Sequence, residues 1–314
     1  MDREERRIFE RGVERATATS TGEALDAALA ELGWSDALID DPRAAVSALF
    51  ESQGSASATS SALGAVLADA LGIPRGAGVV LPVIGACSPP GEVVDGHMRI
   101  AGLAPAGLRR LDAVVVVAGD GESATVLPAD LEWRERPGLD PRLQLCEVTG
   151  ARPHPPAPPS SPRPWDDAVA AGQRAIAHEL VGASRAMLEL ARRHALERTQ
   201  FDRPIAGFQA VRHRLADALV AIEGASATLD AAWDDRTPFT AALAKAVAGR
   251  AARTVARHSQ QVLAGIGFTA EHPLHHYVRR VLVLDGLLGD TRSLTRTLGE
   301  ELLRSRSLPA IVPL

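Results

Sequence analysis

Apolar side chains in the first part of the chain recur every three or four residues, as they do along one face of a helix. The clearest stripe consists of Leu25, Ala28, Leu29 and Leu32. Ser20 and Glu23 precede this stripe in the spacing of a capping box, which predicts a helix start. A stretch of small residues, 52–61, predicts a loop between further helices. The pattern therefore predicts a helical domain over residues 1–73.

The periodicity changes to that of strands between residues 74 and 151. Runs rich in β-branched residues occupy 78–84 and 113–118, and Gly119-Asp120-Gly121 after the second run is typical of a hairpin turn. No segment of this region has a helix-length pattern. We therefore expect a small antiparallel β domain.

A proline-rich linker at residues 152–164 leads into four long helical patterns. These cover residues 165–197, 209–234, 238–266 and 273–304, and each has one apolar face. Helices of this kind pack as an up-down four-helix bundle. The sequence thus predicts a mostly α protein, with a small middle β domain and a C-terminal bundle over residues 165–314.

Composition argues against several classes of protein. The net charge is −5 with both signs interspersed, unlike the basic face of a nucleic-acid binder. No apolar run approaches the roughly 18 residues of a membrane helix, and the charged N-terminus is unlike a signal peptide. Cys87 and Cys146 fit no metal or redox spacing. We therefore expect a cytoplasmic protein with reduced thiols and no metal site.

Two segments of the bundle concentrate chemically capable side chains. The first contains Arg198, Gln200 and Phe201, followed by Phe208 and Gln209. The second reads Gln261-Val262-Leu263-Ala264-Gly265-Ile266-Gly267-Phe268. In order, separation and helical context they resemble two loops of the acyl-CoA dehydrogenase family, Arg-x-Gln/Thr-Phe-Gly and Gln-x-x-Gly-Gly-x-Gly-Phe. The resemblance covers the whole helix–β–helix plan, less strongly before residue 165.

The resemblance implies that both loops cross a subunit interface and contact FAD held mainly by a neighbouring chain. A planar guanidinium such as that of Arg198 suits a pair of pyrophosphate oxygens, and glycines permit close approach of the backbone. The residues assigned to cofactor binding in this way are Arg198, Gln200, Phe201, Phe208, Gln209, Gln261, Gly265 and Gly267.

The family's catalytic base is missing from this sequence. Proton abstraction α to a thioester carbonyl requires a carboxylate in a desolvated pocket. The family carries a glutamate at one of two positions, and matching its pattern places Leu288 at one and Gly172 at the other. The nearby acids are Asp285, Asp290 and Glu179, of which Asp290 needs the smallest displacement to serve as a base.

The β domain departs from the family as well. Residues 84–91 and 102–106 stand where the family has segments that wall the flavin ring, and neither supplies the expected Trp or Thr. The chain is also shorter than a typical member. The leading hypothesis is therefore a dehydrogenase subunit without its own base, which completes the FAD site of a longer catalytic subunit in an α2β2 heterotetramer.

The resemblance also suggests a substrate and an electron acceptor. Heteromeric dehydrogenases of this type act in bacterial steroid side-chain degradation, which implies a steroid acyl-CoA, and an electron-transferring flavoprotein is the family's usual acceptor. Two alternatives stay open. One is a self-sufficient dehydrogenase with Asp290 or Asp285 as its base. The other is a helical scaffold that binds no flavin.

Overall fold

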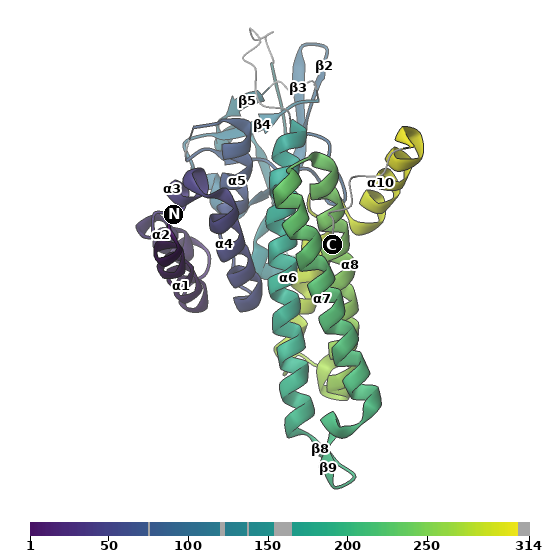
Figure 1. The fold of residues 1–314 in the computed structure, drawn as a ribbon. Coiled ribbons are helices and arrows are strands. Elements are labelled where there is room, and N and C mark those ends of the chain that lie inside the picture. The colour runs from purple at the N-terminus through teal and green to yellow at the C-terminus, as the bar shows by residue number, and fades with distance from the viewer. Residues whose placement is uncertain (75, 120–122, 137, 154–164, 307–314) are drawn as a thin grey trace.

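The computed structural model describes residues 1–314 apart from 75, 120–122, 137, 154–164 and 307–314. N-terminal helices and a small β region lie beside one half of a long helical bundle (Figure 1). The other half of the bundle extends away from them and ends in a short hairpin. This architecture confirms the predicted fold class, mostly α with a small β region.

The N-terminal region is helical, as expected. Its helices are α1 (Arg3–Thr19), α2 (Glu23–Glu31), α3 (Trp34–Asp40), α4 (Pro42–Ala56) and α5 (Ala62–Leu71). The predicted capping box at Ser20 is wrong, because the Ser20 N–H donates to the Ala16 carbonyl and closes α1. The next helix begins after Gly22, whose φ of +62° suits a residue without a Cβ.

Residues 52–56 belong to α4, which corrects the prediction of a loop for the first half of 52–61, while 57–61 form the connection to α5. The helical half consists largely of small residues because α4 crosses α6 (Trp165–Glu197) at close range. A Cβ at Gly54 would overlap the Glu179 carbonyl oxygen, and one at Gly182 would overlap the Glu51 carbonyl oxygen. The two glycines therefore set the distance between the N-terminal helices and the bundle.

Two small sheets form the β region. One has the order β1-β4-β5, from β1 (Gly78–Val79), β4 (Val114–Val117) and β5 (Ser123–Val126). The other has the order β2-β3-β7-β6, from β2 (Gly91–Val94), β3 (His97–Pro105), β7 (Leu145–Pro153) and β6 (Glu132–Glu135). Among these described strands all pairs are antiparallel except β1 with β4, which run parallel. Three 3-10 turns lie between strands: η1 (Ala106–Arg110), η2 (Pro128–Asp130) and η3 (Pro141–Leu143).

The predicted hairpin is present as β4 and β5, with Val117 opposite Ser123. Most of its turn, residues 120–122, lies outside the described residues. The segment predicted as a linker begins inside β7, because Arg152 and Pro153 still pair with β3. The rest of it, residues 154–164, also lies outside the described residues.

The bundle is built from α6, α7 (Gln209–Asp235), α8 (Pro238–Leu263) and a fourth helix that is divided in two. The division gives α9 (Leu274–Gly286) and α10 (Thr291–Ser305), and α10 turns away from the bundle axis (Figure 1). Leu288 and Gly289 have φ of +54° and +92°, which no helix tolerates. Asp290 then accepts hydrogen bonds from two N–H groups of α10 and starts a new helix.

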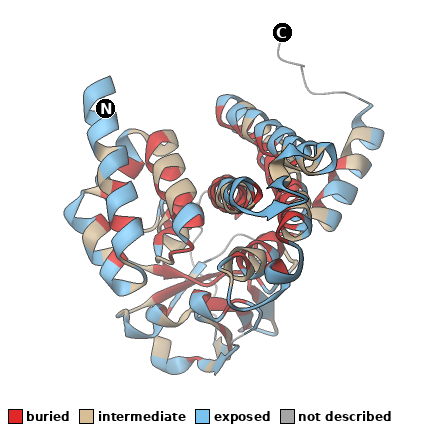
Figure 2. Ribbon diagram, turned by 90° about the horizontal axis from the view of Figure 1, so that it is seen from below, coloured by how far each residue is buried: buried red, intermediate tan, exposed pale blue. Residues whose placement is uncertain are grey.

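One hydrophobic core joins the N-terminal helices to the bundle, and Figure 2 shows the buried residues on the faces that meet. Arg280 of α9 lies inside it, 0% exposed. Its guanidinium pairs with Asp140 and Glu179 and donates to the Ala58 carbonyl at 2.6 Å. The buried cation therefore fastens α9 to η3, α6 and the α4–α5 connection. Within the described residues, no helix combines the length and apolar character that crossing a membrane requires.

Candidate functional site

The first predicted loop forms a hairpin at the tip of the bundle. In it β8 (Thr199–Gln200) pairs with β9 (Arg203–Pro204). Between them Phe201 and Asp202 have φ of +53° and +61°, as in a type I′ turn. Asp202 stands where the family pattern has glycine, and aspartate tolerates this conformation. The turn projects Phe201 outward, and 86% of its surface is exposed.

The second predicted loop forms the 3-10 turn η5 (Ala264–Phe268) after α8. Ala264, where the family pattern has glycine, adopts φ +53° and ψ −134°, a conformation that favours glycine. A Cβ at Gly265 would meet open space, whereas one at Gly267 would press on Leu263 at 2.8 Å. The chain's own packing thus requires Gly267, while Gly265 leaves backbone open to an approaching group.

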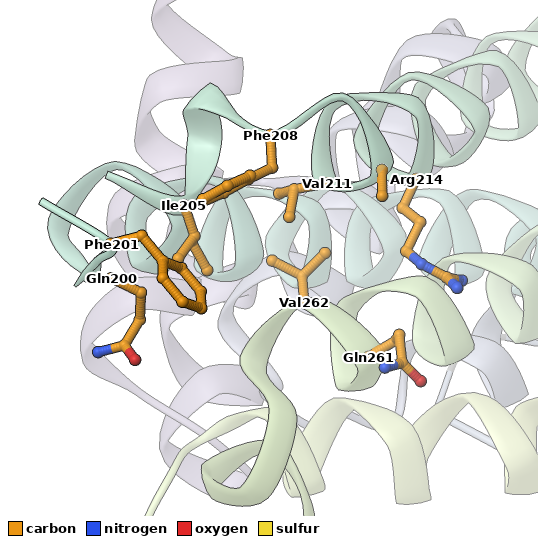
Figure 3. A pocket seen from close by; sticks show the side chains of 9 residues that line it. Gln200, Phe201, Ile205, Phe208, Val211, Arg214, Gln261 and Val262 are labelled. Carbon is orange, nitrogen blue, oxygen red and sulfur yellow. The ribbon is translucent and has the colours of Figure 1, made fainter. Parts of the chain in front are cut away.

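A groove of about 420 Å³ lies between the hairpin, the start of α7 and the end of α8 (Figure 3). It is lined by Gln200, Phe201, Ile205, Phe208, Ala210, Val211, Arg214, Gln261 and Val262. The rings of Phe201 and Phe208 meet edge to face with centroids 6.1 Å apart, and the Arg203 guanidinium covers the Phe208 ring at 4.2 Å. Aromatic faces beside amide groups suit a flat heteroaromatic ligand.

A small apolar cluster holds the hairpin against the bundle. Ala191, Ala195 and Val262 are buried, and Ile205 and Val211 pack against them. The backbone adds a tie, since the Ile205 N–H donates to the carbonyl of the residue that precedes β8, at 2.9 Å. The groove is therefore preformed by the chain itself.

The structure brings four of the eight predicted cofactor residues to this groove: Gln200, Phe201, Phe208 and Gln261. The other four belong to the same loops or their ends but do not line it: Arg198, Gln209, Gly265 and Gly267. Arg198 is exposed, and its guanidinium makes no hydrogen bond or ion pair with any described residue. Its charge is thus available to a group outside the chain.

Sequence reasoning missed five residues of the groove wall: Ile205, Ala210, Val211, Arg214 and Val262. A signal for two of them was present. Val211 follows the predicted Phe208 by three residues at the start of α7, and Arg214 follows Val211 by three more, so helical spacing places both on the same face. Ile205 carries no comparable signal, because its position depends on the hairpin turn.

The two positions expected to hold a catalytic base face each other in the interior. Leu288 is 1% exposed, and its Cδ1 occupies the space into which a side chain at Gly172 would project. Leu63 and Leu67 of α5 approach the same space. Hydrocarbon therefore fills this point, and neither position supplies a carboxylate.

Buried polar groups hold the α9–α10 connection in this arrangement. Gln173 Nε2 donates to the Leu288 carbonyl at 3.0 Å. Lys245 Nζ donates to the carbonyls of Asp285, at 2.9 Å, and Gly289. Burial lowers the pKa of Lys245 to about 8. With its backbone held from two helices, the connection keeps Leu288 packed inside.

Each nearby acid already has a structural partner. Asp290 caps α10, and hydrogen bonds from backbone N–H groups hold its pKa below the usual value. Asp285 pairs with Arg253. Glu179 pairs with Arg280, and burial raises its pKa. Among the described residues, no cluster of three or more His, Cys, Asp or Glu side chains could hold a metal ion.

The segment 84–91, expected near a flavin ring, packs onto the same connection. The Gly85 N–H donates to the Gly286 carbonyl at 2.7 Å. Trp165 Nε1 donates to the Cys87 carbonyl, also at 2.7 Å. A Cβ at Gly289 would lie 2.6 Å from Cys87 Sγ, so the two segments are in tight contact. The β region here closes against the bundle.

Comparison with protein families and curated proteins gives a consistent result. Residues 168–303 match the model of the acyl-CoA dehydrogenase C-terminal domain. The acyl-CoA dehydrogenase IpdE2 of Mycobacterium tuberculosis is 38% identical over 130 residues, 41% of this chain and 41% of that protein. IpdE2 of Mycolicibacterium smegmatis is 31% identical over 196 residues, 60% of this chain and 58% of that protein. The chain thus matches less than two thirds of either relative's length.

Solved structures show that the fold extends over the whole chain. The ChsE4–ChsE5 complex from Mycobacterium tuberculosis gives a TM-score of 0.76 at 21% identity, with 99% of each chain covered. Butyryl-CoA dehydrogenase from Megasphaera elsdenii gives 0.74 at 16% identity, with 97% of this chain and 100% of that chain covered.

Proposed function

We propose that this chain, whose C-terminal domain is that of the acyl-CoA dehydrogenase family, is a subunit that completes the FAD site of a base-bearing partner. The partner would be a longer dehydrogenase chain, paired with this one in an α2β2 heterotetramer. Together they would catalyse α,β-dehydrogenation of an acyl-CoA thioester. FAD would accept the β-hydride, and the base of the partner would take the α-proton.

The main support for the proposal is that hydrocarbon side chains fill the interior at Leu288 and Gly172, the two positions expected to hold a catalytic base. Leu288 occupies the space beside Gly172, so this chain has neither a carboxylate at that point nor space for a side chain on Gly172. The alternative of a self-sufficient enzyme loses support, since Asp290 and Asp285 are both engaged in structural contacts. The reactive half of the site must then come from another chain.

The tip of the bundle fits one edge of FAD. Exposed Arg198 offers a fork of donors for phosphate oxygens, and Gln200 and Gln261 offer amides beside the apolar faces of Phe201 and Phe208. Phe268, at the end of the second loop, is 72% exposed. When two chains share a binding site, each chain alone has an open groove with exposed aromatic rings, and this groove has both features.

Similar proteins support a heteromeric assembly and a steroid substrate. One solved relative is described as a complex of two proteins, ChsE4 and ChsE5. Another, Tcur3481–Tcur3483, is described as a steroid acyl-CoA dehydrogenase and covers 96% of this chain at a TM-score of 0.74 and 22% identity. We therefore propose a steroid side-chain acyl-CoA as substrate. A cytoplasmic location and an electron-transferring flavoprotein as acceptor belong to the same proposal and rest on the family resemblance alone.

The test is co-expression with a candidate partner that carries the glutamate. The expected product is a yellow heterotetramer with one FAD per pair, while the chain alone is colourless. A yellow homo-oligomer of this chain that is reduced by acyl-CoA would contradict the proposal.

Arg198→Ala probes the shared site directly. Removing the guanidinium should lower the affinity of the complex for FAD by about tenfold or more, because charged hydrogen bonds contribute roughly 1.5–3 kcal/mol. Flavin absorbance per complex after dialysis measures this loss. Arg193→Ala, an exposed change on α6, is the matched control and should keep full occupancy. Unchanged occupancy in Arg198→Ala would show that the tip does not contact FAD.

A further inference from the structure

Arg174 of α6 is a buried cation whose hydrogen-bonding capacity is unmet. It is 8% exposed, and its Nε and Nη1 are shielded from solvent with no acceptor among the described residues. The guanidinium lies over the Trp233 ring, 5.1 Å from the centroid. A cation–π contact offsets part of the loss of hydration but provides no hydrogen-bond acceptor in the plane of the guanidinium.

A second cation increases the local excess of positive charge. Arg236, which ends α7, lies 5.6 Å from the same ring centroid and donates to the Trp233 carbonyl. Burial lowers the pKa of Arg174 to about 10, and repulsion from Arg236 adds to the shift. Asp167 favours the charged form, but it is exposed and forms no ion pair with Arg174.

The polar side chains next to Trp233 are bonded to one another. Glu51 pairs with Arg185 and bonds to His178 Nδ1 at 2.9 Å. His178 Nε2 accepts from Trp233 Nε1, also at 2.9 Å. These contacts use the carboxylate and both imidazole nitrogens, so the network next to Trp233 has no acceptor to offer Arg174.

We propose that Arg174, with Arg236 beside it, binds an oxyanion, a carboxylate or phosphate group, at the α7–α8 end of the bundle. An oxyanion supplies acceptors and countercharge together, whereas a water molecule supplies acceptors alone. Arg236 is exposed whereas Arg174 is buried, so an anion held by both would lie between the interior and the solvent.

This site is distinct from the groove at the tip. From Arg174 to Glu197 at its end, α6 makes more than six turns, about 35 Å of helix. Two sources could supply the oxyanion: the phosphate of a small molecule, or a side-chain carboxylate of the partner subunit. The second source depends on the proposed heteromeric function, and the first does not.

The test uses the complex purified with its partner, or the homo-oligomer if the chain proves to assemble alone. Inorganic phosphate is titrated against chloride at constant ionic strength, and thermal unfolding is followed. At about 100 times the dissociation constant, a bound anion should raise the midpoint by roughly 5 °C. Arg174→Met should abolish the rise, and the exposed-site control Arg193→Met should keep it.

The variant is expected to fold, because methionine preserves length and removes an uncompensated buried charge. A phosphate response lost in Arg174→Met identifies a small-molecule phosphate site. No response to phosphate, with subunit pairing at least tenfold weaker in Arg174→Met alone, identifies a carboxylate of the partner. If neither effect occurs, the proposal is overturned. Flavin occupancy, read on the same samples, tests the proposed function separately and should not change in Arg174→Met.

Discussion

Single side chains account for what this chain keeps and what it lacks relative to the family pattern. Leu288 and Gly172 place hydrocarbon where a carboxylate would be needed. Arg198 and Gln261 remain exposed at the tip, where an interaction with another chain or a cofactor is sterically open. Asp290 was the most plausible substitute base in the sequence, and local structure assigns it to a helix cap.

Asp290 provides a prediction at this scale. Asp290→Asn should preserve turnover and flavin occupancy of the complex, because asparagine caps helices as well as aspartate does. Asp290→Ala should lower the free energy of unfolding by about 1 kcal/mol at pH 7. Since the folded-state pKa is lowered, this contribution is complete above about pH 4 and is lost as pH falls through the lowered pKa. Urea denaturation of the unmodified protein and of Asp290→Ala, at pH 7 and at pH 3, measures the contribution of the cap to the free energy of unfolding at each pH.

A different result would reinstate the displaced-base hypothesis. If Asp290→Asn abolished turnover while leaving stability unchanged, the carboxylate would be chemically required. The cap role would then be secondary.

At the scale of elements, helix positions followed from the sequence and helix contacts did not. The apolar periodicity predicted the starts of α6, α7 and α8 at the residues where the structure has them. The stretch 52–61 was interpreted as a loop from its composition alone. Its first half instead belongs to α4, where Gly54 allows the helix to lie against α6, a contact between residues more than a hundred positions apart.

The close contact of α4 and α6 gives the second prediction. Gly54→Ala should destabilise the protein by about 2 kcal/mol or more, because the added methyl overlaps backbone of α6 and forces the helices apart. The control is Gly224→Ala in the middle of α7, where a Cβ meets nothing within 4 Å. That change should stabilise by up to about 1 kcal/mol through helix propensity. Chemical denaturation of both variants measures the difference, and equal effects would contradict the packing argument.

At the scale of the whole molecule, buried charges connect regions that the sequence presents as separate. Arg280 reaches η3 through Asp140 and α6 through Glu179. The division of the fourth helix has a similar origin, because Lys245 of α8 binds carbonyls on both sides of the break. Both features combine residues that are remote in sequence.

Arg280 gives the third prediction. Arg280→Met should lower the free energy of unfolding by about 3–5 kcal/mol, because two carboxyl groups lose their buried countercharge. Adding Asp140→Asn and Glu179→Gln to that variant should recover part of the loss, since no buried charge is then left unpaired. Urea midpoints of the three proteins test this. A loss below about 1 kcal/mol in the single variant would mean that the pairs contribute little to stability.

The sequence by itself predicted a helical N-terminal region, a small β region and the C-terminal bundle, and the resemblance to the family located the two loops and the two base positions, Leu288 and Gly172. These features follow from local periodicity and from residue identity, which need no knowledge of distant contacts. Only the tertiary structure decided that Leu288 fills the space beside Gly172 and that the fourth helix breaks. The tertiary structure also decided that four of the eight predicted residues share one groove, and that Arg174 is buried without an acceptor. Each of these depends on which side chains meet across elements, and burial, overlap and unmet hydrogen bonds exist only once the chain has packed.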